Sequence, residues 1–237
     1  MLLINLLRDI ASGVLEFVYP IRCLKCERIT NTFLCDECLS HVELIAPPIC
    51  SKCGKPSEHR LCHACRNREF HFERVRSSGP FQGMLREAIH ALKYRKLQQL
   101  SNPLIKLLIQ TYPTSGLGKN FDLIVPVPIH RSRMFERGFN QSELLAQGLA
   151  SHLGIPLETR VLYKAINTPH QVDLSPDLRM INVRGSFGIK NPEKTLAKRI
   201  LVIDDVVTTG ATLDEVARVL THAGAASVSG YTLARSL

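Results

Sequence analysis

The feature that most constrains this chain is a pair of matching cysteine arrays near its N-terminus. All eight cysteines of the 237 residues lie between Cys23 and Cys65, in four Cys-x2-Cys pairs. The spacing Cys-x2-Cys-x8-Cys-x2-Cys begins at Cys23 and is repeated, 27 residues later, from Cys50. A repeat of this length predicts two copies of one small module.

Four thiolates at this spacing suit tetrahedral Zn2+, because a tight turn after the first cysteine of each pair directs both sulfurs at one ion. Gly54, directly after Cys53, fits such a turn, since glycine tolerates a positive φ. We predict two structural zinc ions, and their ligands are Cys23, Cys26, Cys35, Cys38, Cys50, Cys53, Cys62 and Cys65. Disulfides, a redox pair or an iron–sulfur cluster are weaker alternatives, because redox motifs do not normally come as four evenly spaced pairs.

The spacing does not decide how the cysteine pairs combine. They can be used sequentially, or they can interleave, with Cys23, Cys26, Cys50 and Cys53 around one ion. Closed four-thiolate sites usually stabilise a domain too small to fold alone, so a scaffold is the first interpretation. A module that also contacts nucleic acid or a protein partner is the alternative.

The first twenty residues are apolar, but they match neither a signal peptide nor a membrane span. The segment lacks a basic start, and Asp9 and Glu16 interrupt its apolar run. Its large aliphatic residues fall on one helical face: Leu2, Leu3, Leu6, Leu7, Ile10, Val14 and Val18. We predict an amphipathic helix packed on its own domain or on a partner, with membrane-surface binding as the alternative. We therefore expect a cytoplasmic protein, with the inner face of the cell membrane as a second location.

Beyond a polar stretch at 67–74, apolar periodicity resumes after Gly79. Apolar residues at 84–92 and 104–108 predict two helices. The pattern then predicts a strand at 122–127 and a helix at 140–153, followed by further strands without assigned bounds. A strand at 199–203, a helix at 212–223 and a strand at 226–233 complete the predicted order.

The ends of these elements also carry signals. Gly154 is expected to end the helix at 140–153, and Thr212 with Glu215 has the spacing of a capping box. Strands that alternate with helices indicate an α/β fold with a mostly parallel sheet flanked by helices. The predicted division is an N-terminal helix at 1–20, a double zinc module at 21–78 and an α/β domain at 79–237.

Residues 201–213, LVIDDVVTTGATL, carry the clearest chemical signal. A buried strand leads into Asp204 and Asp205, and a Thr/Gly loop then leads into a helix. Backbone N–H groups and hydroxyls in such a loop, with the dipole of the helix N-terminus, suit a phosphate. The two carboxylates suit hydroxyls or hydrated Mg2+ instead. The segment therefore predicts a site for a phosphorylated sugar.

Other nucleotide-binding classes are disfavoured, because the chain has no G-x-x-x-x-G-K-[ST] motif and no G-x-G-x-x-G after a strand.

The net charge of +9 favours polyanionic partners. Residues before Pro80 carry 11 basic and 9 acidic side chains, or +2, and the remainder carry 19 and 12, or +7. A candidate DNA-binding patch follows the first helix of the α/β domain, at Lys93, Arg95 and Lys96.

The segment IDDVVTTGAT resembles the phosphoribosyl pyrophosphate (PRPP) signature of type I phosphoribosyltransferases. Together with VPVP at 125–128, RGFNQ at 137–141 and the double Cys-x2-Cys repeat, it makes the whole chain resemble the ComF family of competence proteins. The resemblance implies a type I phosphoribosyltransferase fold behind an N-terminal double zinc ribbon. It also implies a role in natural transformation, in which incoming single-stranded DNA is brought into the cytoplasm.

The resemblance assigns roles to individual residues. Asp204 and Asp205 would hold ribose, with Mg2+, and the PRPP loop would comprise Val206, Val207, Thr208, Thr209, Gly210, Ala211 and Thr212. The pyrophosphate loop would carry His130, Arg131, Arg133 and Arg137, although a solvated basic loop is the alternative for these residues. The flexible region that closes over such sites would include Thr168, Gln171, Arg179 and Asn182.

Two functions from different classes follow from these residues. The first is a competence protein that handles single-stranded DNA and carries a PRPP-binding site. The second is an active Mg2+-dependent phosphoribosyltransferase with an unidentified acceptor and no DNA binding of its own. The low aromatic content, 6% with no tryptophan, offers little for base stacking. An adaptor that docks other DNA-uptake proteins is a third possibility.

Overall fold

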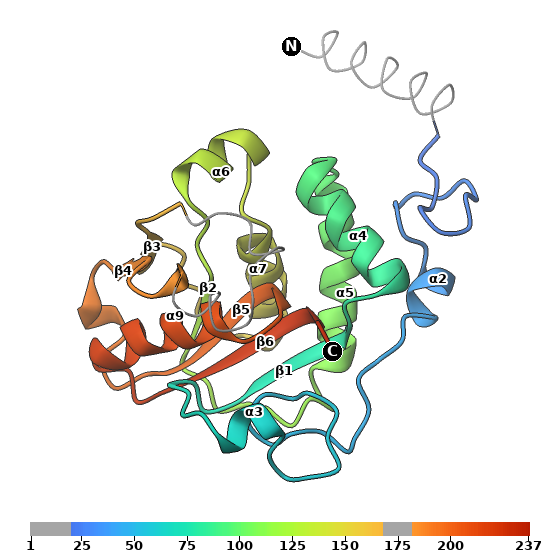
Figure 1. Ribbon diagram of the computed structural model, residues 1–237. Helices are drawn as coiled ribbons and strands as arrows, with labels where there is room; N and C mark the ends of the chain where they lie inside the picture. The colour runs from blue at the N-terminus through green and yellow to red at the C-terminus, as the bar shows by residue number, and fades with distance from the viewer. Residues whose placement is uncertain (1–19, 168–181) are drawn as a thin grey trace, which may run out of the picture.

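The computed structural model describes residues 20–167 and 182–237. They form a parallel sheet covered by helices, with two cysteine modules beside it (Figure 1). The amphipathic helix predicted at 1–20 lies outside the described residues, except for Pro20. No helix in the described part of the chain is both long and apolar enough to cross a bilayer.

The main sheet has four strands in the order β1, β6, β5, β2, and every neighbouring pair is parallel. The outer strands are β1 (Val75–Pro80) and β2 (Leu123–Pro126), and the central strands are β5 (Arg199–Val207) and β6 (Ser227–Arg235). The central strands are buried along nearly their whole length, which explains their almost continuous apolar sequences.

Helices cover both faces of this sheet. On one face, α4 (Gly83–Tyr94), α5 (Ser101–Thr111) and α7 (Gln141–Leu153) share a core with Leu201 and Ile203 of β5. On the other face, α9 (Ala211–His222) packs with Ile200 and Val202 (Figure 1). Successive side chains of β5 therefore point toward different helices.

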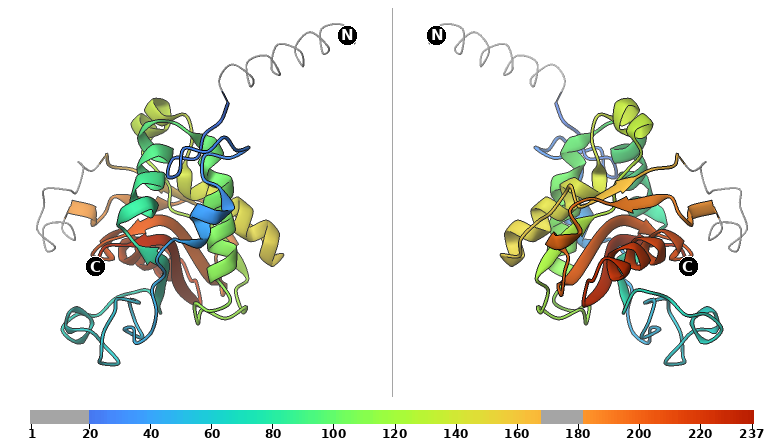
Figure 2. Two further views of the ribbon diagram at one scale, coloured as in Figure 1. Left: turned by 90° about the vertical axis from the view of Figure 1, so that its right-hand side faces the viewer. Right: turned by 90° about the vertical axis from the view of Figure 1, so that its left-hand side faces the viewer.

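The two cysteine modules lie at different places on the α/β domain (Figures 1 and 2). The first, with α2 (Asp36–Ser40), lies beside α4 and α5, and Asp36 forms an ion pair of 2.7 Å with Lys106 of α5. The second, with α3 (His63–Arg66), lies against β1. At Gly54, φ is +74°, and an added Cβ would lie 2.6 Å from the carbonyl oxygen of Val75. Glycine was predicted at position 54 because of the turn, and the short distance to Val75 also requires it there.

Most predicted elements of the α/β domain are present. Helix α7 begins after Asn140, whose side chain accepts a hydrogen bond from the backbone of Ser142, and ends at Gly154 with φ +68°. Strand β5 continues to Val207, beyond the end predicted at 203, so both aspartates belong to the strand.

The capping box predicted at Thr212 and Glu215 is wrong. Helix α9 begins one residue earlier, after Gly210 at φ +86°, and it has no such side-chain cap. Instead, the Thr209 hydroxyl accepts a hydrogen bond of 3.3 Å from the backbone N–H of Ala211. The Glu215 carboxylate accepts from Gly185 and Arg218.

Some elements have no counterpart in the sequence prediction. Strand β1 begins at Val75, before the boundary predicted at 78/79, and places that stretch in the main sheet. The other unforeseen elements are η1 (Gln98–Leu100), α6 (Arg131–Arg137) and η3 (Pro192–Lys194). The strands predicted without bounds after the helix at 140–153 correspond to a hairpin of β3 (Leu162–Lys164) with β4 (Phe187–Ile189).

Candidate functional site

The acidic pair lies in the C-terminal half of β5, where neighbouring elements enclose both carboxylates. Asp204 is 8% exposed and Asp205 is 3% exposed. Buried carboxylates need partners, because desolvation of an ionised group is costly. The two aspartates have different partners, so they are not equivalent to each other.

Asp205 belongs to a charged network on the α4 and α7 side of the sheet. Its Oδ2 forms an ion pair with Lys93 of α4, and its Oδ1 accepts a hydrogen bond of 3.1 Å from Gln141 of α7. Gln141 in turn accepts from the guanidinium of Arg137, which is 8% exposed. Burial raises the pKa of Asp205, but Lys93 and these hydrogen bonds outweigh burial and lower it. Asp205 is therefore the ionised counter-charge of Lys93.

Asp204 has no cationic side chain in hydrogen-bonding contact among the described residues. Its Oδ1 accepts from the Ser142 hydroxyl at 2.8 Å and from the backbone N–H of Asp205 at 2.9 Å. Burial, and next the charge of Asp205, raise the pKa of Asp204 to about 7. Near neutral pH this carboxyl group is thus poised between its protonated and ionised forms.

The Thr/Gly loop lies beside Asp204 in one cleft of ≈ 230 Å³. One wall is formed by Phe81, His90, Lys93 and Tyr94, and the other by Asp204 and most of residues 206–213. Gly210 has the left-handed backbone that directs the chain into α9. The cleft therefore combines a carboxyl group with the backbone at the start of a twelve-residue helix.

The segment before α9 packs against residues 70–72, which belong to the polar stretch at 67–74. Phe72 is 1% exposed, and Phe70 and Phe72 are the side chains that a Cβ at Gly210 would contact. The backbone N–H of His71 donates a 2.6 Å hydrogen bond to Asp214 of α9. This stretch thus positions the loop, and the alternation of its aromatic residues at 70 and 72 was the available signal.

The RGFNQ segment supports the site rather than lining it. Asn140 donates a 3.0 Å hydrogen bond to the carbonyl oxygen of Val127, so it joins the VPVP segment to the start of α7. Gln141 and Ser142 then reach the two aspartates. Sequence reasoning missed Gln141 and Ser142, because their partners lie more than sixty residues away in the chain.

The residues expected in a pyrophosphate loop fall into two groups. His130 caps α6 by accepting a 3.2 Å hydrogen bond from the backbone of Ser132, and Arg131 and Arg133 lie on α6 with at least partial exposure. Arg137 is instead buried in the Asp205 network, and its guanidinium lies 5.8 Å from the ring centre of Tyr94. Arg131 is exposed and Arg133 is half-buried on α6, whereas Arg137 is held inside the Asp205 network.

The candidate DNA-binding patch is divided in the same way. Lys93 points into the site and pairs with Asp205, while Arg95 and Lys96 are exposed at the end of α4. Thr168, Gln171 and Arg179 lie outside the described residues, and Asn182 is the first described residue after that gap.

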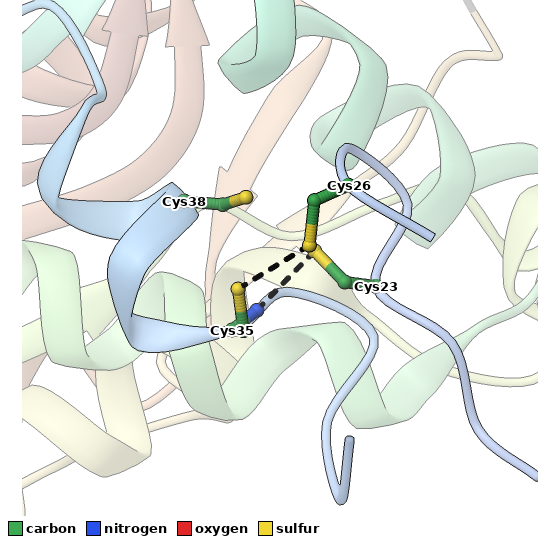
Figure 3. A group of neighbouring side chains, drawn as sticks. All are labelled: Cys23, Cys26, Cys35 and Cys38. Carbon is green, nitrogen blue, oxygen red and sulfur yellow. Dashed lines mark hydrogen bonds between the residues drawn. The ribbon is translucent and has the colours of Figure 1, made fainter. Parts of the chain in front are cut away.

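The cysteines combine sequentially. The four sulfur atoms of Cys23, Cys26, Cys35 and Cys38 lie within 4.8 Å of one another (Figure 3), and so do those of the second array, Cys50, Cys53, Cys62 and Cys65. The interleaved pairing is thereby excluded.

The separations within each cluster fit zinc. The sulfur atoms of Cys26 and Cys35 are 3.8 Å apart, and those of Cys53 and Cys62 are 3.7 Å apart. A tetrahedron with Zn–S bonds of about 2.3 Å has edges of about 3.8 Å, whereas a disulfide is about 2.05 Å long. All eight cysteines are free thiols. When bound, zinc would supply the cross-link that holds each small module together.

Two buried arginines approach the second cluster from the sheet. Arg235 of β6 is 3% exposed and donates a 2.5 Å hydrogen bond to the carbonyl oxygen of Cys53. Arg76 of β1 is 9% exposed and donates to the carbonyl oxygen of Ser51 at 3.0 Å. Four thiolates around a bound Zn2+ would carry a net charge of −2, which these two guanidinium groups would offset.

Comparisons with known proteins match both parts of the chain. A family model described as a double zinc ribbon domain matches residues 14–69, and one described as a phosphoribosyl transferase domain matches residues 140–236. Among solved structures, a glutamine PRPP amidotransferase from B. subtilis has 23% identity, a TM-score of 0.39, and coverage of 56% of this chain and 26% of that chain.

The fold and the cysteine clusters define a phosphoribosyltransferase-type α/β protein with an N-terminal double zinc ribbon. ComFC, a competence protein of Bacillus subtilis, is 33% identical over 211 residues, which cover 86% of this chain and 84% of ComFC. The DNA utilization protein YhgH of Escherichia coli K12 is 31% identical over 91% of this chain and 90% of YhgH. Competence protein F of Haemophilus influenzae is 26% identical over 92% and 98%. The chain belongs to the ComF family of competence proteins.

Proposed function

We propose that the cleft between α4 and α9 binds PRPP together with Mg2+, in a competence protein that handles incoming single-stranded DNA in the cytoplasm. The observation that carries the proposal is the position of the Asp204 carboxyl group and the Thr/Gly loop in one cleft. The loop would bind the phosphate of such a ligand, and the carboxyl group would bind the hydroxyl groups of its sugar ring.

The 5-phosphate would lie at Thr208–Thr212. Backbone N–H groups at the start of α9 are without helical partners, and the helix dipole favours an anion at this end. Gly210, which adopts φ +86°, permits the turn that opens the backbone to the cleft. The hydroxyl groups of Thr208 and Thr212 add donors at the cleft wall.

The ribose would lie at Asp204, which lines the cleft, rather than at both aspartates. Asp205 already holds Lys93 and Gln141, so we assign it the role of positioning Lys93 at the edge of the cleft. When bound, Mg2+ would neutralise pyrophosphate charge and bring the ligand close to an ionised Asp204. The exposed guanidinium of Arg131, with Arg133, would meet the pyrophosphate.

The DNA part of the proposal is supported by the relatives and by charge. Relatives that cover most of this chain are named for competence and for DNA utilization. The net charge of +9 favours a phosphate backbone, and Arg95 and Lys96 lie exposed at the end of α4, the helix that forms one wall of the cleft.

The test is calorimetric titration of the zinc-loaded protein with PRPP, with and without Mg2+. We expect saturable binding that needs Mg2+ and is weakened at least ten-fold by Asp204→Asn. Asp122→Asn is the matched control, because Asp122 pairs with Arg199 at the opposite end of β5. PRPP affinity that is the same in the wild type and in Asp204→Asn would contradict the proposal.

A further inference from the structure

Helix α6 projects from the α/β domain and carries two exposed apolar side chains (Figure 1). Phe135 is 94% exposed, which is the largest exposed fraction of any large hydrophobic residue in the described chain, and its neighbour Met134 is 39% exposed. We call these two residues the α6 tip. Single apolar residues on a surface are common, but a phenylalanine exposed to this extent contributes almost nothing to its own fold. The α6 tip is therefore a candidate contact surface.

Both ends of α6 are anchored, so the fold defines the position of the α6 tip. The side chain of His130 caps the first turn, and the helix ends at Gly138, where φ is +85°. Arg137 in the last turn is buried in the network around Asp205. Because the helix is already ordered, a ligand would meet Phe135 at a small cost in conformational entropy.

The α6 tip lies next to a basic surface. The guanidinium of Arg137 lies 5.8 Å from the ring centre of Tyr94, the last residue of α4, so α6 is adjacent to the end of α4. Arg95 and Lys96 follow directly and are exposed. Proteins that bind single-stranded nucleic acid combine aromatic rings, on which bases stack, with cations that meet the phosphates. The α6 tip and the end of α4 offer this combination.

A membrane surface fits the α6 tip less well. Helices that lie in a membrane interface bury a long apolar face. Helix α6 has seven residues, RSRMFER, of which only Met134 and Phe135 are apolar. One exposed ring beside basic residues matches the requirements of a nucleic-acid strand more closely than those of a bilayer.

We propose that Phe135 stacks on a base of single-stranded DNA, while the basic end of α4 binds neighbouring phosphates of the same strand. The inference rests on the DNA part of the proposed function and names the residue that contacts a base. The residues of the α6 tip are not among those that line the cleft around Asp204, so the contact requires neither PRPP nor a phosphorylated strand end. Every base has a π-face, so we expect the contact to tolerate any sequence.

The first experiment compares two labelled strands of equal length and charge, an oligothymidylate and a strand of abasic deoxyribose phosphates. Each is titrated with the full-length, zinc-loaded protein, and fluorescence anisotropy reports binding. We expect the wild type to bind oligothymidylate more tightly than the abasic strand. Phe135→Ala should weaken oligothymidylate binding roughly ten-fold, in line with base–aromatic stacking, and leave the abasic strand within about two-fold. Phe135→Tyr, which keeps a ring, should retain the wild-type affinity.

The matched control is Leu196→Ala. Leu196 is 62% exposed and precedes β5, so it lies at the end of the strands away from α6. This variant removes a comparable exposed apolar side chain and should leave both affinities unchanged. Salt provides a second control, because Phe135→Ala removes no phosphate contact and should therefore keep the wild-type slope of log affinity against log salt.

The second experiment detects the contact directly. The sequence contains no tryptophan, so Phe135→Trp introduces a single fluorescent reporter at the α6 tip. Oligothymidylate should quench its fluorescence at saturation, and the abasic strand should not. The corresponding reporter introduced by Leu196→Trp should respond to neither strand.

Three outcomes would overturn the stacking contact. The first is an equal loss for both strands in Phe135→Ala, or no loss for oligothymidylate. The second is a blue shift of the Phe135→Trp fluorescence on vesicles of phosphatidylserine and phosphatidylcholine without quenching by oligothymidylate, which would assign the α6 tip to a membrane surface. The third is failure of the wild type to bind either strand, which would also count against the DNA part of the proposed function.

Discussion

At the scale of single residues, the two adjacent carboxylates of the site have different partners. Asp205 is held by Lys93 and Gln141, whereas Asp204 is held by a hydroxyl and a backbone N–H. A cation that belongs to the protein thus neutralises one carboxylate and leaves the other facing the cleft. Lys93 therefore connects α4 to the C-terminal part of β5.

The first prediction concerns the Lys93–Asp205 ion pair. Lys93→Met removes the cation but keeps most of the aliphatic stem, and it leaves a buried carboxylate without its counter-charge. We expect the free energy of unfolding to fall by on the order of 3 kcal/mol, because removal of one partner of a buried pair leaves an uncompensated charge. Urea denaturation measures the change.

A double-mutant cycle distinguishes this effect from lost packing. Lys93→Met with Asp205→Asn should recover most of the loss, since neither charge then remains unpaired. Lys96→Met removes the same charge from an exposed position nearby and should change stability by less than about 0.5 kcal/mol. Additive losses in the double variant would contradict the pairing.

The second prediction follows from the raised pKa of Asp204. Its folded-state pKa of about 7 lies above the ordinary value of 3.8, so the folded protein binds more protons than the unfolded chain between these values. This contribution to stability is complete at low pH and is lost as pH rises through about 7. In Asp204→Asn the loss should be absent.

The measurement is denaturant unfolding of both proteins between about pH 5.5 and 8.5 in zinc-containing buffer. The wild type should lose stability relative to Asp204→Asn as pH rises, by at most about 1.4 kcal/mol per pH unit. Other titrating groups are shared by the two proteins and cancel in the difference. Parallel pH profiles would mean that Asp204 keeps an ordinary pKa.

At the scale of elements, local sequence predicts the strand and the loop but not what surrounds them. The run 199–203 indicates a buried strand because it is continuously apolar after Arg199, and Gly210 marks the turn that follows. Glu215 has the right spacing for a cap, yet Gly185 and Arg218 bind its carboxylate after the chain folds. Strand β1 escaped prediction because serine and glycine occupy its middle, where Ser78 is satisfied by Thr111 from α5.

The third prediction concerns the contact between the second zinc ribbon and the sheet. Arginines of β6 and β1 donate hydrogen bonds to backbone carbonyl oxygens of this ribbon. Arg76 and Arg235 are buried beside the Cys50, Cys53, Cys62 and Cys65 cluster. Loss of this zinc leaves two buried guanidinium groups without a nearby negative charge. We expect Cys62→Ser to increase amide hydrogen exchange in β1 and β6 by at least ten-fold, as measured by mass spectrometry.

The first ribbon provides the control, because it packs on different elements. Cys23 and Cys38 share a core with α4 and α5, so Cys35→Ser should increase exchange mainly in those helices. The same exchange pattern in both variants would show that the arginines do not couple the second cluster to the sheet. Zinc content, measured in each variant, confirms that one ion has been lost.

At the scale of the whole molecule, the sequence gives the total charge, but it does not show which charged side chains are buried in ion pairs and which are exposed. The excess of +7 after residue 80 is plain from composition. Folding then withdraws Lys93 and Arg137 into the Asp205 network and leaves Arg95 and Lys96 exposed. The same step gathers Phe81, His90 and Tyr94, which are unremarkable in sequence, along one cleft. These roles depend on contacts between distant segments.

The fourth prediction tests where this charge meets DNA. Single-stranded DNA affinity should fall steeply with salt, because bound Lys and Arg release counterions from the phosphates. Arg95→Ala with Lys96→Ala should reduce the slope of log affinity against log salt by about 1.4, or about 0.7 for each lost phosphate contact. Fluorescence anisotropy of a labelled oligonucleotide over a salt series provides the measurement.

A variant with the same charge change at the opposite end of the strands distinguishes a local DNA contact from an effect of the net charge. Lys119 and Lys198 are exposed and precede β2 and β5, so they lie at the ends of the strands away from the cleft. Lys119→Ala with Lys198→Ala should keep the wild-type slope, because these side chains are remote from α4. Equal reductions in both double variants would mean that DNA responds to the overall field of the protein, and the end of α4 would lose its assignment as the contact surface.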